Sequence, residues 1–504
     1  MDNRKNITPK KILLISTSAE KNALININRE LIPATDDGVH YPLGLAYLYS
    51  ALEKAGHEVQ LLFLTKHDDN DCYNKIKDAL GKFLPEIVGF QMLTFNRVST
   101  YRMIECIHEK YPHIHQIIGG IHATAMYQQI IKKYPYVIAV MSEGEIVFPD
   151  LLNELAEPKP NLNSVDGIAF SENGAVKETK PKKLIENLDD IPFPKHELFF
   201  KEKRKIGSII TTRGCPFNCS FCCLNFVSRN RVRMRTVDNI IKEIEWMVDK
   251  FPQMDTIWIQ DDTFFVDNQR VIDFCDEIIK RGIKINFACN GRMKPISEKM
   301  VKKLEQANFK RIFLGLESGD NRILKKCHKG ITQEDAINAY KLFAKTKINI
   351  YSHLIVGLSG ENIDTIMETA NFMKKLQKIK YVPNYYPYLL IVFPGTEIYE
   401  IAKAAGSIGD DYWLSDKPAP FFTTENSYEQ LIHFQEILLY NVSLTRALFT
   451  WTGFKAQFSI IPCHLKYIFN NRKNAKYFFI GAAKFILPAG IYGYLKKIYH
   501  RFKN

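Results

Sequence analysis

The feature that most limits how this 504-residue chain can fold is an alternation of short apolar runs with helical patterns, which occurs twice. In the first third of the chain, runs such as KKILLIS, HEVQLLFL and YVIAVMSEGE have the length of buried parallel strands. Segments with helical apolar spacing, such as PLGLAYLYSALEKAGHEV, lie between such runs. Strands that alternate with helices predict a parallel, doubly wound sheet. Residues 1–155 are therefore expected to form a Rossmann-like domain whose ligand lies over the carboxyl ends of its strands.

A second alternation begins at Lys205 and contains six apolar runs, which are IGSIITT, TIWIQDD, INFACNG, RIFLGLES, NIYSHLIVGL and YVPNYYPYLLI. Six units are too few for a closed eight-stranded barrel, so residues 205–415 predict a partial (β/α)6 barrel. Chemistry in such barrels takes place at the C-terminal ends of the strands. Residues 156–204 contain turn residues and X-Pro steps, and are interpreted as a linker with a small β extension. The expected fold class is α/β throughout these segments.

The formal net charge of +13 is concentrated at the end of the chain. Beyond Glu436 the sequence holds eleven Lys and Arg residues and no Asp or Glu, so the first 436 residues carry only +2. We expect residues 416–504 to form a helical region with a basic tail. Two interpretations of the tail stay open, namely a segment at an anionic membrane surface and a helical subdomain packed on the barrel. Nucleic acid is not an expected partner, because no recognition motif accompanies the charge.

Four of the ten cysteines lie in TTRGCPFNCSFCCLNF, directly after the first strand of the second alternation. The N-terminus does not read as a secretory signal, so a cytoplasmic, reducing compartment is expected and a disulfide framework is not. Cys215, Cys219 and Cys222 have Cys-x3-Cys-x2-Cys spacing and lack the second pair that a structural zinc site uses. Three thiolates suit a [4Fe–4S] cluster with one open iron. Cys223 lies outside the pattern and is interpreted as a packed neighbour.

The stretch CPFNCSFC resembles the radical S-adenosylmethionine (radical SAM) signature, in which an aromatic residue precedes the last cysteine. The resemblance covers about residues 205–415. It implies that the three cysteines bind three irons of the cluster and that SAM binds the fourth. One electron, from a donor such as flavodoxin or ferredoxin, would cleave SAM to methionine and a 5′-deoxyadenosyl radical. The cofactor would carry the chemistry while the protein excludes water and orients the radical. No residue is assigned as catalytic.

Polar residues at later strand ends are further candidates for contacts to SAM. The resemblance implies that the strand end WIQDDTF helps to hold the SAM amino group, and of its two carboxylates we favour Asp262. An Asx turn or helix cap is the alternative. Glu317 and Ser318 are candidates for hydrogen bonds to the SAM ribose or amine, although Ser318 also suits a helix N-cap. Gly357 and Gly360 would let the backbone approach the adenine or methionine.

The first third of the chain resembles the cobalamin-binding domain that precedes this kind of radical SAM domain. The resemblance rests on PLGLAYLYSALEKAGHEV, IIGGIHAT and SEGE, and it implies that glycines at strand ends let the flat corrin ring approach the backbone. The expected cofactor-binding residues are Thr94, Gly119, Gly120, His122, Glu143 and Gly144. The DxHxxG motif that supplies a cobalt ligand in other cobalamin proteins is absent, because His57 lacks its context. No protein ligand to cobalt is therefore assigned.

Together these resemblances predict a cobalamin-dependent radical SAM enzyme that methylates an unactivated carbon of a small-molecule or lipid-like substrate. One SAM would methylate the cobalamin, and a second would supply the radical. One alternative is an oxygen-independent oxidative cyclase like the anaerobic magnesium-protoporphyrin monomethyl ester cyclases, which share both domains. A second alternative is a non-catalytic iron–sulfur binding or scaffold protein at a membrane. The expected location is cytoplasmic, with the tail at the inner face of the membrane.

Overall fold

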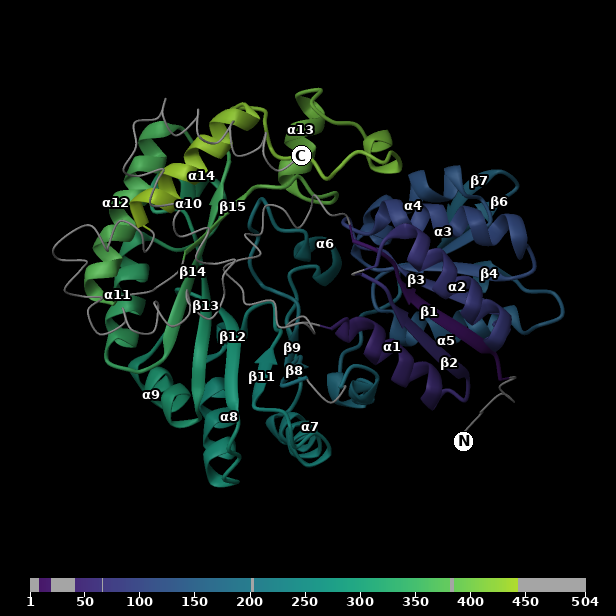
Figure 1. Cartoon of the computed structure of the whole chain (residues 1–504), viewed down its shortest axis with the longest axis horizontal. Coiled ribbons are helices and arrows are strands. Elements are labelled where there is room, and N and C mark those ends of the chain that lie inside the picture. The colour runs from purple at the N-terminus through teal and green to yellow at the C-terminus, as the bar shows by residue number, and fades with distance from the viewer. Residues whose placement is uncertain (1–8, 20–40, 66, 201–203, 381–384, 443–504) are drawn as a thin grey trace, which may run out of the picture.

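The computed structural model describes residues 9–19, 41–65, 67–200, 204–380 and 385–442. Figure 1 shows two α/β units side by side, the first in purple and blue and the second in teal and green. The expectations for the basic tail fall on residues 443–504, which lie outside the described residues. Among the residues that are described, no helix has the length and apolarity needed to cross a membrane.

The first unit is built on a seven-stranded sheet with the order β2-β1-β3-β4-β5-β6-β7. The strands from β1 to β5 pair in parallel, and β6 and β7 extend the sheet with antiparallel pairing. The strands are β1 (Lys11–Ser16), β2 (Glu58–Phe63), β3 (Ile87–Gln91), β4 (His115–Gly119), β5 (Val137–Val140), β6 (Ile168–Glu172) and β7 (Ala175–Glu178). The helices are α1 (Leu43–Lys54), α2 (Asp69–Phe83), α3 (Arg97–Lys110), α4 (Ile121–Lys133) and α5 (Gly144–Leu155). The doubly wound sheet is as predicted, and the expected β extension joins it.

Helices cover both faces of this sheet because neighbouring residues of a strand point to opposite faces. Leu13 and Ile118 belong to the core beneath α2, α3 and α4, whereas Leu14 and Ile117 belong to the core beneath α1 and α5. All four side chains are almost completely buried. The carboxyl ends of β1, β3, β4 and β5 are thus left as the edge of the parallel sheet at which a ligand can bind.

The second unit is built on six parallel strands with the order β15-β14-β13-β12-β11-β8. Each of the six predicted runs forms one strand, and the sheet is open because β8 and β15 are its two edges. The strands are β8 (Ile206–Ile209), β11 (Thr256–Ile259), β12 (Asn286–Arg292), β13 (Phe309–Glu317), β14 (Asn349–Val356) and β15 (Tyr385–Leu389). A short hairpin of β9 (Thr212–Arg213) and β10 (Arg233–Met234) follows β8.

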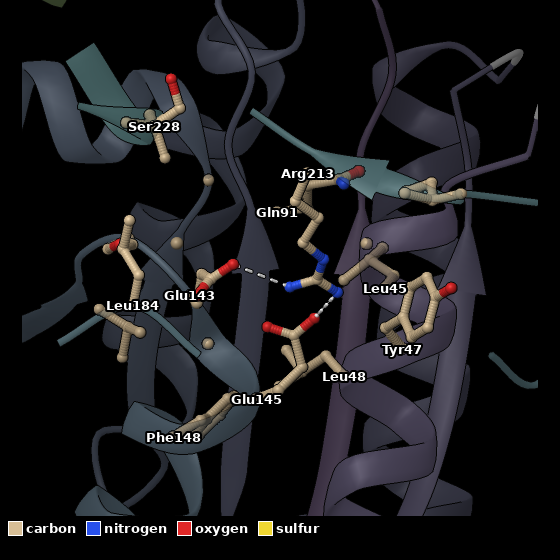
Figure 2. A pocket seen from close by; sticks show the side chains of 18 of the residues that line it. Leu45, Tyr47, Leu48, Gln91, Glu143, Glu145, Phe148, Leu184, Arg213 and Ser228 are labelled. Carbon is tan, nitrogen blue, oxygen red and sulfur yellow. Dashed lines mark hydrogen bonds and ion pairs between the residues drawn. The ribbon is translucent and has the colours of Figure 1, made fainter. Parts of the chain in front are cut away.

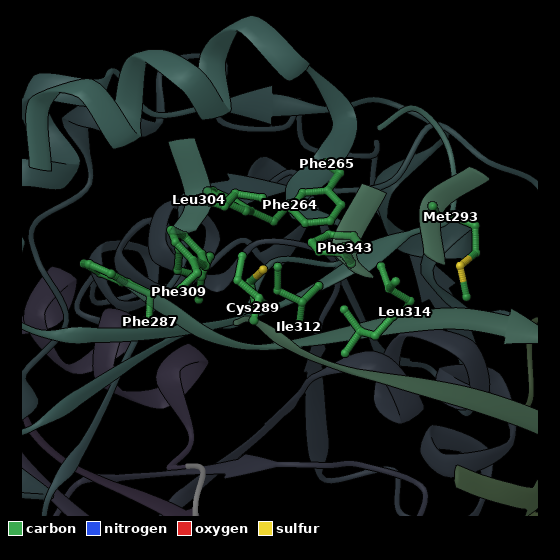
Figure 3. Packing of buried hydrophobic residues seen from close by; sticks show 14 of the residues in the cluster. Phe264, Phe265, Phe287, Cys289, Met293, Leu304, Phe309, Ile312, Leu314 and Phe343 are labelled. Atoms are coloured by element: carbon green, nitrogen blue, oxygen red, sulfur yellow. The ribbon is translucent and has the colours of Figure 1, made fainter. Parts of the chain in front are cut away.

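Helices cover the outer face of the six-stranded sheet (Figure 1). They are α7 (Val237–Lys250), α8 (Asn268–Lys280), α9 (Glu298–Gln306), α10 (Asn321–Lys326), α11 (Gln333–Ala344), α12 (Ile363–Ile379) and α14 (Tyr428–Val442). Two further helices lie toward the first unit, namely α6 (Leu224–Ser228) in the cysteine loop and α13 (Glu397–Ala404). The chain also contains short 3₁₀ helices, labelled η. They are η2 (Leu162–Ser164), η3 (Leu188–Asp190), η4 (His196–Leu198), η5 (Phe264–Val266) and η6 (Asp410–Leu414). Figure 3 shows the core between sheet and helices, in which the rings of Phe287 and Phe309 stack 5.2 Å apart.

The segment that follows α13 returns to the first unit. Trp413, in η6, is fully buried, and the Arg97 guanidinium lies 5.3 Å from its ring. Arg97 also donates hydrogen bonds to the carbonyl oxygens of Thr94, at 2.9 Å, and Trp413, at 3.3 Å. Gln129 in α4 donates to the Asp410 carboxylate at 3.0 Å. The contacts of Arg97 with Trp413 and of Gln129 with Asp410 join residues roughly 300 positions apart and fasten the first unit to the segment after α13.

Candidate functional site

A cavity of about 330 Å³ lies between the two units. The first unit contributes the ends of β3, β4 and β5 and the start of α1, and the second contributes the hairpin and loop that follow β8. Five of the predicted site residues line this cavity, namely Gly119, Gly120, Glu143, Gly144 and Asp262. The cavity therefore lies where the strand ends of a doubly wound sheet predict a ligand.

Three glycines form a cradle on the wall of the cavity that belongs to the first unit. A Cβ atom added to Gly44 would come no closer than 3.9 Å to another heavy atom, and one added to Gly119 or Gly144 no closer than 3.6 Å. None of the three has a positive φ, so neither the backbone nor the packing requires glycine there. Gly120 differs, because its φ is +102° and an added Cβ would lie 2.9 Å from the Met92 carbonyl oxygen. The cradle is thus space that the protein leaves unfilled.

Several buried polar atoms on the cavity wall lack a hydrogen-bond partner within the described part of the chain. They are Ser142 Oγ, Thr212 Oγ1, Ser228 Oγ and Arg233 Nε. Buried polar groups are normally paired, and an unpaired one costs free energy. A bound molecule that carries amides and hydroxyls, as cobalamin does, would supply these partners. The glycine cradle and the unpaired atoms therefore suit one face of cobalamin, the rest of which extends beyond this cavity of about 330 Å³.

An ion-pair network joins the two units inside the cavity. Figure 2 shows the Arg213 guanidinium between the carboxylates of Glu143 and Glu145, at 3.1 Å and 2.6 Å. Arg233 binds the other oxygen of Glu143 at 2.7 Å, and the backbone N–H of Ile185 donates to that oxygen at 2.7 Å. Burial opposes the charged carboxylate, yet Arg233 and Arg213 hold the pKa of Glu143 below its ordinary value. Glu143 therefore ties the cradle loop to the hairpin of the second unit.

The cysteine loop, which connects β9 to β10 within the hairpin, begins at Gly214. This position needs glycine for two reasons. Its φ is +91°, and an added Cβ would lie 2.1 Å from the Arg231 carbonyl oxygen. Asp261 fixes the chain just before this point, because its carboxylate accepts hydrogen bonds from the backbone N–H of Thr211, at 2.6 Å, and Thr212, at 3.1 Å. The strand end of β11 therefore holds the start of the cysteine loop in place.

The two carboxylates at the end of β11 have different environments. Asp261 is fully buried and engaged by the loop, whereas Asp262 lines the cavity and accepts one hydrogen bond, from Gly214 N–H at 3.1 Å. Burial, together with the charge of Asp261, raises the pKa of Asp262 to about 6. Asp262 is thus the carboxylate that faces a ligand. This placement favours Asp262 over Asp261, although contact with SAM stays a prediction.

The three cysteines of the signature lie in one loop. Cys219 is buried, its Sγ lies 3.8 Å from the His328 carbonyl oxygen, and its own carbonyl accepts the Cys222 N–H at 3.0 Å. Burial raises the pKa of Cys222 to about 12, and the neighbouring thiols of Cys219 and Cys215 add to the rise. Iron would supply the positive charge that such a buried group of thiolates requires.

Within the described ranges, no three His, Cys, Asp or Glu side chains converge on a site for one metal ion. A cluster does not require such convergence, because each thiolate binds a different iron. The free, clustered thiols of the loop therefore fit a [4Fe–4S] cluster, with Cys215, Cys219 and Cys222 as its ligands.

Two residues predicted to bind cobalamin do not line the cavity. His122 is buried, with its Nδ1 3.2 Å from Thr94 Oγ1 and its Nε2 3.5 Å from the Tyr101 hydroxyl. Burial, followed by the charge of Arg97, lowers the pKa of His122 to about 3, so the ring is neutral. Thr94 and His122 thus bond to each other beneath η6, where Trp413 packs on the histidine ring. The geometry does not support either as a cofactor contact.

Glu317, Ser318 and Gly357, which were predicted to bind SAM, form hydrogen bonds or an ion pair with other residues of the protein. Glu317 pairs with Lys329 at 2.6 Å, and both are buried. Ser318 Oγ lies 3.2 Å from Thr369 Oγ1, and Asp320, not Ser318, caps the helix α10 that follows.

The Gly357 N–H donates to the carboxylate of Glu361 at 2.6 Å, and the Gly360 N–H donates to Glu425. Neither glycine lines the cavity between the units. Contacts of Glu317, Ser318 and Gly357 with SAM stay predictions.

Arg213 was missed from the sequence, and Arg292, which the strand end NGRMKPIS offered only as a surface cation or a contact to a carboxylate, instead lies against the cysteine loop. Arg213 directly precedes the cysteine loop, but its partners lie about 70 residues away in the first unit. Arg292 ends β12 and lies 3.8 Å from Cys219 Sγ. A basic residue at a strand end of the barrel was the only available signal, and the sequence does not show whether such a residue points inward.

Comparison with known proteins agrees with this division of the chain. Residues 209–373 match the radical SAM superfamily, and residues 30–152 match the B12 binding domain. The chain is 29% identical over 400 residues to an uncharacterized methyltransferase of Pyrococcus horikoshii, which covers 78% of this chain and 84% of that protein. It is 28% identical over 341 residues to the anaerobic magnesium-protoporphyrin IX monomethyl ester cyclase of Rubrivivax gelatinosus, covering 65% of this chain and 61% of that enzyme.

The fold is also similar to that of a solved cobalamin-dependent radical enzyme. The solved structure of OxsB, a cobalamin-dependent S-adenosylmethionine radical enzyme with aqua-cobalamin and S-adenosylmethionine bound, superposes with a TM-score of 0.68 at 19% identity. The match covers 95% of this chain and 75% of OxsB. The cofactors of the chain are accordingly a [4Fe–4S] cluster, SAM and cobalamin. The chain belongs to the cobalamin-binding radical SAM protein family, and it is an enzyme.

Proposed function

We propose that this enzyme transfers a methyl group from SAM to an unactivated carbon of a small molecule bound in the cavity between the two units. The observation that carries the proposal is that the glycine cradle, Gly214 at the start of the cysteine loop and Asp262 line one cavity, which the three cysteines adjoin in sequence but do not line. A carbon held there can reach both cofactors. The relative from Pyrococcus horikoshii, which spans most of both chains and is named a methyltransferase, supports methyl transfer.

The cysteine loop has a defined part in this reaction. Cys215, Cys219 and Cys222 hold the cluster, and Asp262 accepts a hydrogen bond from the amino group of SAM. With a pKa of about 6, Asp262 is mostly charged at neutral pH and can accept a hydrogen bond from an N–H of that amino group. When bound, the cluster supplies the electron that cleaves SAM, and cobalamin carries the methyl group.

The cavity walls exclude water and orient the corrin ring. Gly44, Gly119 and Gly144 admit the ring close to the backbone, and Glu143 keeps the cradle against the hairpin. Apolar side chains cover the second unit's wall beside the loop, and they are Ile210, Leu224 and Val227. A dry wall protects a carbon radical from side reactions with solvent.

Two reaction products test the proposal. Methyl transfer from SAM leaves S-adenosylhomocysteine, whereas radical formation leaves 5′-deoxyadenosine and methionine. Anaerobically reconstituted holoprotein should form both products from SAM that carries a deuterated methyl group, with dithionite as the electron donor. The cobalamin fraction should acquire the label. Holoprotein that binds both cofactors but forms no S-adenosylhomocysteine would contradict methyl transfer.

An oxygen-independent oxidative cyclase is the second candidate, and the relative from Rubrivivax gelatinosus supports it. This chain covers less than two thirds of that enzyme, so its substrate does not transfer directly. The same assay separates the candidates, because a cyclase forms 5′-deoxyadenosine without S-adenosylhomocysteine. A non-catalytic iron–sulfur scaffold would form neither product.

The partners and location of the enzyme are also part of the proposal. We propose a cytoplasmic enzyme that takes electrons from a flavodoxin or ferredoxin and that meets anionic membrane through residues 444–504. Each basic residue near an anionic surface contributes about 1 kcal/mol to binding. The protein should sediment with anionic vesicles at low salt, and a chain shortened by residues 444–504 should not. If the full and shortened chains sediment equally with the vesicles, the proposed membrane contact is wrong. A soluble substrate would then be favoured over a lipid-like one.

A further inference from the structure

Arg292 makes direct contact with the cysteine loop from the end of β12. The side chain is buried, its Nη1 lies 3.8 Å from Cys219 Sγ, and its guanidinium carbon lies 3.5 Å from the centre of the Phe217 ring. Its Nη2 donates a hydrogen bond to the Lys329 carbonyl oxygen. The guanidinium is thus held between the loop and the segment that follows α10.

The positive charge of Arg292 is not neutralised locally. Arg213 and Arg233 each pair with a glutamate, whereas Arg292 forms no ion pair with a carboxylate of the described residues. Its Nε has no hydrogen-bond partner in the same part of the chain.

We propose that Arg292 sets the reduction potential of the cluster that the three cysteines hold. Reduction by an external one-electron donor adds one negative charge to the cluster and changes no protonation state of Arg292, because a guanidinium does not deprotonate in proteins. A buried positive charge stabilises the reduced form more than the oxidised form. An N–H donor aimed at a ligand sulfur acts in the same direction, since hydrogen bonds to the sulfurs tune such clusters. The inference rests on the cluster part of the proposed function and not on its substrate.

The test is a redox titration of the reconstituted holoprotein, followed by electron paramagnetic resonance in the absence of SAM. Arg292→Met and Arg292→Gln remove the charge, and Arg292→Lys retains it. Lys294→Met is the matched control, because it removes one positive charge two residues away that is exposed and pairs with Asp335 at 3.5 Å. Because SAM is omitted, a variant that binds SAM more weakly does not change the measured potential for that reason.

We expect both neutral variants to shift the equilibrium at least tenfold toward the oxidised cluster, which is 59 mV to lower potential for one electron. The reduction potential of Arg292→Lys should lie between those of the neutral variants and the wild type, and that of Lys294→Met should equal the wild-type potential. An unchanged or raised potential in the neutral variants overturns the proposal. Loss of the cluster from both neutral variants also overturns it, because Arg292 would then hold the loop and not tune it. Failure to form S-adenosylhomocysteine leaves these potentials unaffected.

Discussion

Replacement of Gly44 by alanine separates the stability of the fold from the binding of cobalamin. Gly44 lies in the first turn of α1 with an ordinary backbone conformation, and an added Cβ would meet nothing closer than Gln91 Nε2 at 3.9 Å. The fold can therefore accept the methyl group. Alanine is favoured over glycine in a helix by about 0.5–1 kcal/mol, so the apoprotein should unfold at the same temperature or slightly higher.

The same methyl group would occupy the cradle. Gly44 lines the cavity and is exposed to it, so the added carbon takes space that the corrin ring requires. Overpacking a fitted site costs about 1–3 kcal/mol, which corresponds to a cobalamin Kd raised about 5- to 150-fold. Anaerobic titration of the apoprotein with hydroxocobalamin, followed by absorbance, measures this change.

Gly81→Ala is the matched control for this experiment. Gly81 lies inside α2, its φ is not positive, and an added Cβ would have no heavy atom within 4 Å. It lies away from the cradle, so this variant should gain the same stability and bind cobalamin as the wild type does. The reasoning fails if Gly44→Ala binds cobalamin with wild-type affinity, or if Gly81→Ala weakens binding equally.

The remaining predictions concern the loop, the network and a buried acid. Cys219→Ala should lose the iron and sulfide of the reconstituted protein whereas Cys223→Ala should retain them, and full retention by Cys219→Ala would refute the ligand assignment. Glu143→Gln and Arg213→Gln should together destabilise the holoprotein less than the sum of the single changes, by about 0.5–3 kcal/mol in the free energy of unfolding. Additive effects would show that this pair does not join the units. Burial raises the pKa of Glu361 from 4.5 to about 8, so the folded state retains a proton that the unfolded chain releases, and stability falls as the pH rises between these values. The Tm of Glu361→Gln relative to wild type should therefore rise from about pH 5 to about pH 8, and a constant difference would exclude this effect.

The strands could be predicted from the sequence because most of the parallel strands, such as β1 and β11, are buried on both faces. Runs such as KILLIS and TIWI are mostly apolar, so their positions and alternation with helices are readable. The radical SAM signature was equally readable, since the spacing of Cys215, Cys219 and Cys222 lies within eight residues of one loop, and their role as cluster ligands stays a prediction. Local sequence contains the whole of that signal.

Contacts between the units could not be predicted in the same way. Thr94 and His122 follow the expected strand ends, yet both side chains turn toward α3 and η6, and the partner Trp413 is 291 positions from His122. The ion pair between Glu143 and Arg213 joins residues 70 positions apart, and neither of the surrounding sequences, SEGE and TTRG, indicates it. Side-chain direction after a strand depends on how the following helix docks, which is a property of the tertiary structure.

The central claim is that cobalamin and the cluster lie next to each other, with cobalamin in the cavity between the units and the cluster in the cysteine loop that begins at the cavity wall with Gly214. Both can be made paramagnetic, as cob(II)alamin and as the reduced cluster, so electron paramagnetic resonance of the doubly reconstituted protein tests it most directly. The account predicts that the cob(II)alamin signal broadens or relaxes faster when the cluster is reduced, and that Cys219→Ala protein with bound cobalamin lacks this effect. Identical cob(II)alamin spectra and relaxation with the cluster oxidised and reduced would contradict it, because the two cofactors would then lie in separate sites.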